Sequence, residues 1–138
     1  MLKSRVYYLL ILLFALVIGA GCSVINGDTQ SSTFTIKVDS INVPSEVASD
    51  DTLTVRPFGT VGPNGCYSFE RFESSRTSSS LDLKLVGELT EGDDIGCFDA
   101  IVQLDTVFKV PPPLEGSFEI NIQQPDESVL SRTVEVKD

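Results

Sequence analysis

The stretch TFTIKV at residues 33–38 alternates strictly between polar and apolar side chains. In an extended chain successive side chains point to opposite faces, so the apolar residues of this stretch share one face. This pattern is typical of a half-buried strand. We expect the strand to continue to Val43 and to stop at Pro44, which has no amide hydrogen to donate to a neighbouring strand.

The same alternation recurs between turn signals along the rest of the chain. GPNG at residues 62–65 favours a turn, because proline fixes the backbone angle φ at one position and Asn-Gly tolerates the positive φ that the following position needs. Pro57 and Gly59 indicate a bulge or a strand end. Loops are expected at 74–80 and 90–96, and an extended connector at 111–113. The pattern predicts strands over residues 52–56, 66–73, 81–85 and 97–110, the last as one or two strands, and a final hairpin of 117–123 and 129–136.

No helical spacing of apolar residues is sustained after residue 21. Short strands with turns every eight to twelve residues are typical of a β-sandwich. We therefore expect an all-β, immunoglobulin-like or fibronectin-like β-sandwich of seven or eight strands. The chain has no tryptophan, so the buried tryptophan of antibody domains is missing and the sequence predicts the architecture rather than membership of that family.

The amino-terminal residues predict an export signal with a helical apolar core. Lys3 and Arg5 precede thirteen apolar residues, Val6–Ile18. A helix of that length reaches only about 20 Å, short of the ~30 Å hydrocarbon layer of a membrane. This size is typical of the apolar core of a secretory signal.

Gly19, Ala20 and Gly21 follow, and Cys22 comes directly after them. This order resembles the lipobox of bacterial lipoprotein precursors, although Gly19 stands where that family usually has a branched apolar residue. The resemblance implies that Cys22 receives a diacylglyceryl group, that cleavage precedes it and that its amino group is acylated. Two or three acyl chains anchor a protein stably. Ser23, which is not aspartate, favours the outer membrane by analogy with proteobacterial sorting. The alternatives are an ordinary signal cleaved after Ala20 or Gly21, and an uncleaved signal anchor.

The expected organisation is a signal peptide at 1–21, a flexible tether at 22–32 and a β-sandwich domain at 33–138. Removing residues 1–21 from 138 leaves 117, enough for one domain. Two of the ten basic residues lie in the signal and all twenty acidic residues lie beyond it, so 8 against 20 give the mature chain a charge of −12. Such acidity repels phosphate backbones and excludes nucleic acid as a partner.

Cys66 and Cys97 are expected to form a structural disulfide, because cysteines left in an exported chain usually pair. They are 31 positions apart, for which chain entropy predicts a stabilisation of roughly 3–4 kcal/mol. The spacing is not that of a redox motif, and the chain lacks the further sulfur or histidine ligands that zinc needs. Pairing these two cysteines leaves Cys22 for lipid.

The chain has no histidine, which removes the residue on which most nucleophilic and acid–base sites depend. Neither a P-loop nor a dinucleotide fingerprint is present. Four acidic residues near one loop, Glu91, Asp93, Asp94 and Asp99, are weak calcium candidates without EF-hand spacing. A small hydrolase that uses carboxylates such as Asp93 and Asp94 is a further alternative. We expect no enzyme activity, no cofactor and no metal site.

Aromatic side chains offer a glycan-binding alternative. Tyr67, Phe69 and Phe72 are predicted to span both faces of one strand, so that one of them is exposed for stacking on a sugar. Four other phenylalanines in strand patterns are expected to be core residues: Phe58, Phe98, Phe108 and Phe118.

GPNGCY at 62–67, the second cysteine, PPPLEG at 111–116 and the final hairpin together resemble small bacterial lipoproteins with an immunoglobulin-like domain of unknown function. The resemblance implies a fold and a place at the cell envelope, facing the periplasm or the exterior. The sequence therefore predicts a lipid-anchored, non-enzymatic binding or structural module. Its partners are the bilayer and an unknown envelope protein or glycan. The alternative is a secreted domain that binds a glycan or calcium without lipid.

Overall fold

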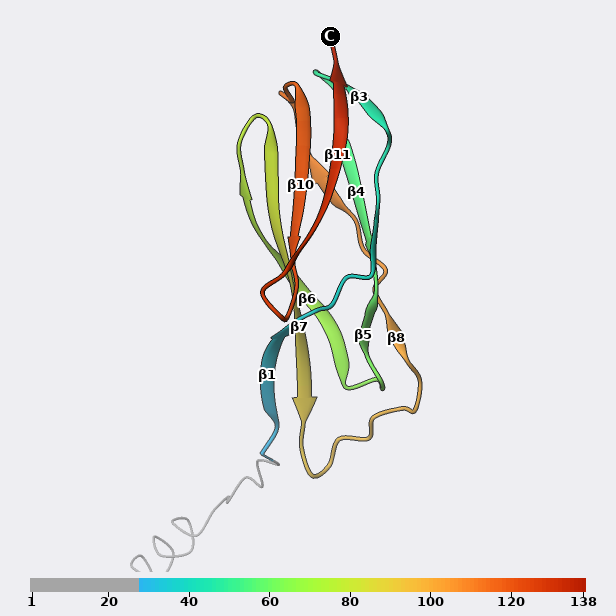
Figure 1. Cartoon of the computed structure of the whole chain (residues 1–138). Helices are drawn as coiled ribbons and strands as arrows, with labels where there is room; N and C mark the ends of the chain where they lie inside the picture. The colour runs from blue at the N-terminus through green and yellow to red at the C-terminus, as the bar shows by residue number, and fades with distance from the viewer. Residues whose placement is uncertain (1–27) are drawn as a thin grey trace, which may run out of the picture.

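A computed structural model describes residues 28–138 of the chain. The predicted signal, Cys22 and most of the predicted tether lie outside the described residues. The described part is an all-β, immunoglobulin-like sandwich, as the alternation predicted (Figure 1). None of residues 28–138 forms a helix long and apolar enough to cross a membrane.

Eleven strands follow one another in this part of the chain: β1 (Gln30–Thr35), β2 (Ser40–Asn42), β3 (Glu46–Ala48), β4 (Leu53–Phe58), β5 (Thr60–Gly62), β6 (Tyr67–Arg76), β7 (Ser80–Glu91), β8 (Val102–Gln103), β9 (Phe108–Val110), β10 (Ser117–Gln123) and β11 (Val129–Lys137). The turn at GPNG and the final hairpin of β10 and β11 are confirmed.

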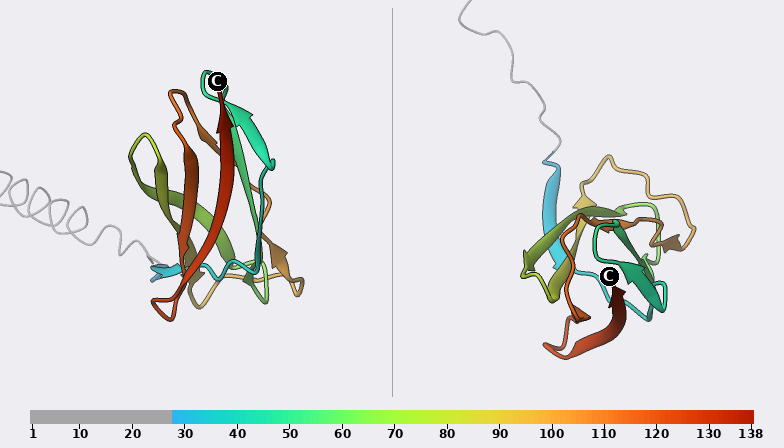
Figure 2. Two further views of the ribbon diagram at one scale, coloured as in Figure 1. Left: turned by 45° about the horizontal axis from the view of Figure 1, so that its top comes forward. Right: turned by 90° about the horizontal axis from the view of Figure 1, so that it is seen from above.

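The larger layer is a six-stranded sheet centred on β7. One edge of β7 pairs with β6, and its other edge pairs antiparallel with β1 and parallel with β10, beyond which lie β11 and β3. The second layer contains the sheet β2–β4–β9, and β5 continues from β4 to pair with β8. Figure 2 shows the two layers facing each other.

The core lies between the layers and follows from the alternation within their strands. In β4 the side chains of Leu53, Val55 and Pro57 are buried while their neighbours are exposed. In β10 the residues Phe118, Ile120 and Ile122 are fully buried in the same way. Leu53 and Val55 belong to one apolar cluster with the three residues of β10. The burial of both sets stabilises the packing of one layer on the other.

The predicted strand over 33–43 is divided, because the chain changes layers within it. The amide of Ile36 still donates to the carbonyl of Leu85 in β7 (2.9 Å), whereas the amide of Asp39 donates to the carbonyl of Phe58 in β4 (2.8 Å). This crossover separates β1 from β2 and accounts for part of the larger number of strands. β1 also begins at Gln30, within the range predicted as tether.

The serine-rich segment predicted as a loop over 74–80 is mostly strand, so that prediction was wrong. Ser74, Ser75 and Arg76 pair with β7, and the connection shrinks to 77–79. The amide of Thr77 donates to the carbonyl of Ser80 at 2.9 Å and closes the hairpin. Backbone pairing with β7 therefore extends β6 through Ser74 and Ser75.

The first strand and the last residue of the described chain lie at opposite ends of the sandwich. β1 begins at the lower end in Figure 1, where β7 also finishes, and the chain terminates at the upper end. The turn between β6 and β7 lies at the upper end as well. The described chain therefore enters the domain at one end and leaves it at the other.

Candidate functional site

The connection between β7 and β8 is the most distinctive feature of the lower end, and we name its residues 92–101 the disulfide loop. Cys97 within it forms a disulfide with Cys66, the residue directly before β6, and their Cα atoms are 5.2 Å apart. The predicted disulfide is thus confirmed. Cys66 is buried and Cys97 is exposed, so the bond ties a surface loop to the sandwich.

Backbone hydrogen bonds hold the disulfide loop from both sides of Cys97. The amide of Gly65 donates to the carbonyl of Phe98 (2.9 Å), and the amide of Thr90 donates to the carbonyl of Cys66 (3.0 Å). The side chain of Asn64, in the GPNG turn, accepts from the amide of Cys66 at 3.0 Å. The turn predicted from sequence therefore also positions one half of the disulfide.

The four acidic calcium candidates do not form a site. Glu91 ends β7, and Asp93, Asp94 and Asp99 lie in the disulfide loop with exposed side chains. Within residues 28–138, no three acidic or cysteine side chains gather closely enough to hold a metal ion. A hollow of about 250 Å³ lies beneath the loop, between residues such as Tyr67, Leu89 and Ile95, and neither Asp93 nor Asp94 lines it.

Tyr67, Phe69 and Phe72 lie on one face of β6, contrary to the prediction that they span both faces. The register against β7 shifts between Phe69 and Arg71, so a β-bulge inserts one residue and turns Phe72 to the same side as the other two. All three are half-buried against the core. Phe69 contacts Phe72 with ring centres 4.8 Å apart, and Phe72 contacts Phe108 edge-on at 5.1 Å.

Phe118 is fully buried and Phe108 is half-buried, but two of the four phenylalanines expected in the core are exposed. Phe58 is 39% exposed, because the alternation of β4 turns it outward, where it lies under the guanidinium group of Arg56. Phe98 is 64% exposed, because it lies in the disulfide loop and not in a strand. Its ring leans on Gly65, where a Cβ atom would overlap it.

A buried glutamine that the sequence analysis missed joins the β10–β11 turn to the crossover between β1 and β2. The Oε1 atom of Gln124 accepts from the amide of Val38 at 3.1 Å. Its Nε2 atom is buried and has no partner among the described residues. A hollow of about 420 Å³ lies beside it, lined by residues that include Lys37, Asp126 and Leu130. Only the position of a glutamine in a predicted turn was available from the sequence, and this gives no sign of burial.

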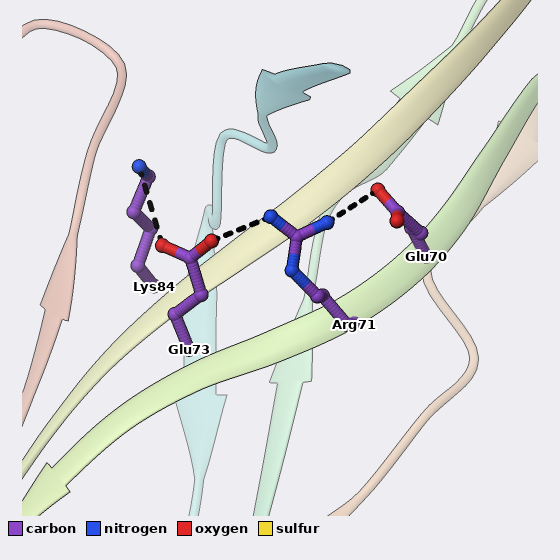
Figure 3. A network of polar contacts seen from close by, with 4 residues as sticks. All are labelled: Glu70, Arg71, Glu73 and Lys84. Carbon is purple, nitrogen blue, oxygen red and sulfur yellow. Dashed lines mark hydrogen bonds and ion pairs between the residues drawn. The ribbon is translucent and has the colours of Figure 1, made fainter. Parts of the chain in front are cut away.

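The bulged strand β6 also carries a network of charges that reaches across to its neighbour β7 (Figure 3). Arg71 bridges Glu70 and Glu73, each at 2.7 Å, and Lys84 on β7 lies 3.5 Å from Glu73. The hydrogen bond from Arg71, aided by the charge of Lys84, holds the pKa of Glu73 below its ordinary value. The same bond raises the pKa of Arg71. Bulges and charges on an edge strand disfavour pairing with another strand.

Comparison with protein-family models, with characterised proteins and with solved structures gave no match. The function of the site must therefore be inferred from the residues and geometry of this chain. What the lower end presents to solvent is a loop tied down by a disulfide, with exposed apolar and acidic side chains. Such a surface is suited to contact with a partner.

Proposed function

We propose that this chain is a bacterial lipoprotein whose β-sandwich acts as a non-enzymatic binding or structural module at the cell envelope. In this proposal Cys22 bears the acyl chains and residues 23–29 tether the domain to the membrane. Ser23 favours the outer membrane. The domain itself then faces the periplasm or the exterior.

The disulfide between Cys66 and Cys97 is the observation that carries the proposal. Disulfides form and persist in oxidising compartments and are rare in the cytosol, which supports export of this domain. The chain has three cysteines, so this pairing leaves Cys22 without a partner cysteine in the same chain. A cysteine in that situation, directly after small residues and an apolar run, is best explained as an acylation site.

The residue types of the domain support a binding or structural role over catalysis. The chain has no histidine, and Asp93 and Asp94 are exposed on a loop and line no hollow with the other acidic candidates. Hydrolysis by a pair of carboxylates needs both groups to flank the bond that is cleaved, and an exposed loop does not enclose a substrate in this way. A binding surface does not require such an arrangement of carboxylates.

Metabolic labelling with an alkyne-bearing fatty acid tests the proposal in a bacterial host that exports the full chain. We expect label on the wild-type protein and its loss in the Cys22→Ser variant. The Cys66→Ala/Cys97→Ala variant is the matched control, because it also removes cysteines but keeps Cys22. Its label per amount of protein should equal that of the wild type.

Two results would contradict the proposal. Equal label on wild type and Cys22→Ser would place the acyl chain elsewhere. An unlabelled wild-type protein in the culture medium would favour the alternative of a secreted domain that binds a soluble ligand.

A further inference from the structure

The exposed apolar residues of the disulfide loop lie at the end where the chain enters the domain. Gln30, the first residue of β1, pairs with Glu91, the last residue of β7. A methyl group placed on Gly92 would lie 3.5 Å from the carbonyl oxygen of Asp28. The root of the disulfide loop and the first described residues are therefore neighbours (Figure 1).

The covalent chain limits how far this end can be from Cys22. Five residues separate Cys22 from Asp28, so six steps join their Cα atoms, and a fully extended chain covers at most about 3.6 Å per step. An acylated Cys22 would thus hold the root of the loop within about 20 Å of the membrane surface. The twelve residues of β7 extend about 36 Å away from that end. The turn between β6 and β7 therefore lies at the end of the domain that is far from Cys22.

Phe98 and Ile101 are the two most exposed large hydrophobic side chains among residues 28–138, at 64% and 65%. Both belong to the disulfide loop, and the bonds of Cys97 and of the Phe98 carbonyl hold the backbone beside them in place. Little ordering of the backbone is then needed when the two side chains are buried by a partner. A short tether also keeps the nearest surface at a high effective concentration.

We propose that Phe98 and Ile101 enter the interface of the bilayer that holds the acyl chains, so that the domain rests on the membrane by its disulfide loop. This inference depends on the proposed acylation of Cys22. Residues 92–101 contain no lysine or arginine but contain Asp93, Asp94 and Asp99. The contact is therefore apolar, and it suits zwitterionic headgroups better than anionic ones, which repel carboxylates.

The absence of tryptophan from the chain makes a clean experiment possible. Single variants Phe98→Trp and Ile101→Trp place one fluorophore on the disulfide loop, and Ser78→Trp places one in the exposed turn at the opposite end. Each full-length variant is matured in a bacterial host, purified and reconstituted into vesicles of phosphatidylcholine with brominated acyl chains. The intact mass of each sample reports acylation of the same molecules.

We expect the tryptophans at positions 98 and 101 to lose most of their fluorescence in brominated vesicles relative to unbrominated ones, and the one at position 78 to lose almost none. Acylated protein with no quenching at either loop position would overturn this inference while leaving the anchor intact, and would leave the loop for a protein or glycan partner. Protein without acyl mass would overturn the proposed function, and the inference with it. Quenching at all three positions would show unspecific adsorption and would also contradict the inference.

Discussion

Gln124 and Val38 lie 86 positions apart, and the amide of Val38 donates a hydrogen bond of 3.1 Å to the side-chain oxygen of Gln124. The bond joins the β10–β11 turn to the place where the chain changes layers. Val38 is buried, and Gln124 is the acceptor that its amide finds. One side chain thus satisfies a backbone donor at the crossover.

The Gln124→Ala variant should be less stable by about 1–3 kcal/mol, because the amide of Val38 would be buried without an acceptor. Urea unfolding with the disulfide intact measures the loss. The neighbouring Gln123 is exposed, and Gln123→Ala is the control that should leave the midpoint almost unchanged. Equal midpoints for both variants would mean that the Gln124 bond contributes nothing to stability.

Removal of the disulfide should lower the free energy of unfolding by roughly 3–4 kcal/mol, as expected for a loop closed over 31 positions. The Cys66→Ala/Cys97→Ala variant compared with wild type in urea measures this. Alkylation of the exported wild-type protein without reductant should leave both cysteines unmodified. Modification of either one in the folded, unreduced protein would contradict the assigned pairing.

The two phenylalanines at positions 118 and 98 should respond very differently to truncation. Phe118→Ala should cost about 3–5 kcal/mol, because it leaves a cavity in the core. Phe98→Ala should change stability by about 0.5 kcal/mol or less, as is usual at exposed positions. Thermal or urea unfolding of the two variants side by side checks this, and similar losses would be inconsistent with the exposed position of Phe98.

Gly87 is expected to be intolerant of a side chain. A Cβ atom there would lie 2.5 Å from the ring of Phe34, which crosses β7 at this point. Gly87→Ala should therefore displace the ring and cost about 1–3 kcal/mol. In a Phe34→Ala background the same change should cost clearly less, and a double-mutant cycle measures the difference. An additive cycle would show that the ring is not the obstacle.

Asp126 provides a test that depends on pH. The side chain and the amide of Ser128 both donate to its carboxylate, at 2.6 and 3.1 Å, and hold its pKa below the ordinary value. A lowered pKa in the folded state means that this carboxylate stabilises the fold above its unfolded pKa of about 3.9, and that the stabilisation is lost as the pH falls through the folded value. An NMR titration should find the pKa of Asp126 raised in Ser128→Ala. An unchanged value would show that the Ser128 hydroxyl is not the cause.

The alternation of polar and apolar residues was sufficient to predict the fold class and most long strands. β4 and β10 bury every second side chain, and the positions of β4, β10 and β11 agree with the pattern to within one or two residues. The turn at GPNG and the pairing of Cys66 with Cys97 were also predictable, because each depends on local turn chemistry or on the number of cysteines.

Features that depend on contacts distant in sequence were not predictable. The bulge between Phe69 and Arg71 reverses the side-chain parity of β6, and nothing in its own residues indicates this. The strand β3 is three residues long and exists through its parallel pairing with β11. Gln124 is buried only because two remote segments meet over it.

The candidate site was predicted in part. The sequence indicated the disulfide, but it assigned Phe98 to the core, because Phe98 falls within the strand pattern predicted over residues 97–110. The exposure of Phe98 and Ile101 depends on the path of the disulfide loop, which the sequence does not determine. The position of β1 beside this loop is likewise a result of pairing with β7.

The most direct test of the central proposal is the intact mass of the full-length protein extracted from host membranes, together with sequencing of its amino-terminal peptide. We predict a mature chain that begins at Cys22 and bears the mass of a diacylglyceryl group and an amide-linked acyl chain. An unmodified chain that begins at or near that residue would contradict the proposal and would make this a secreted domain.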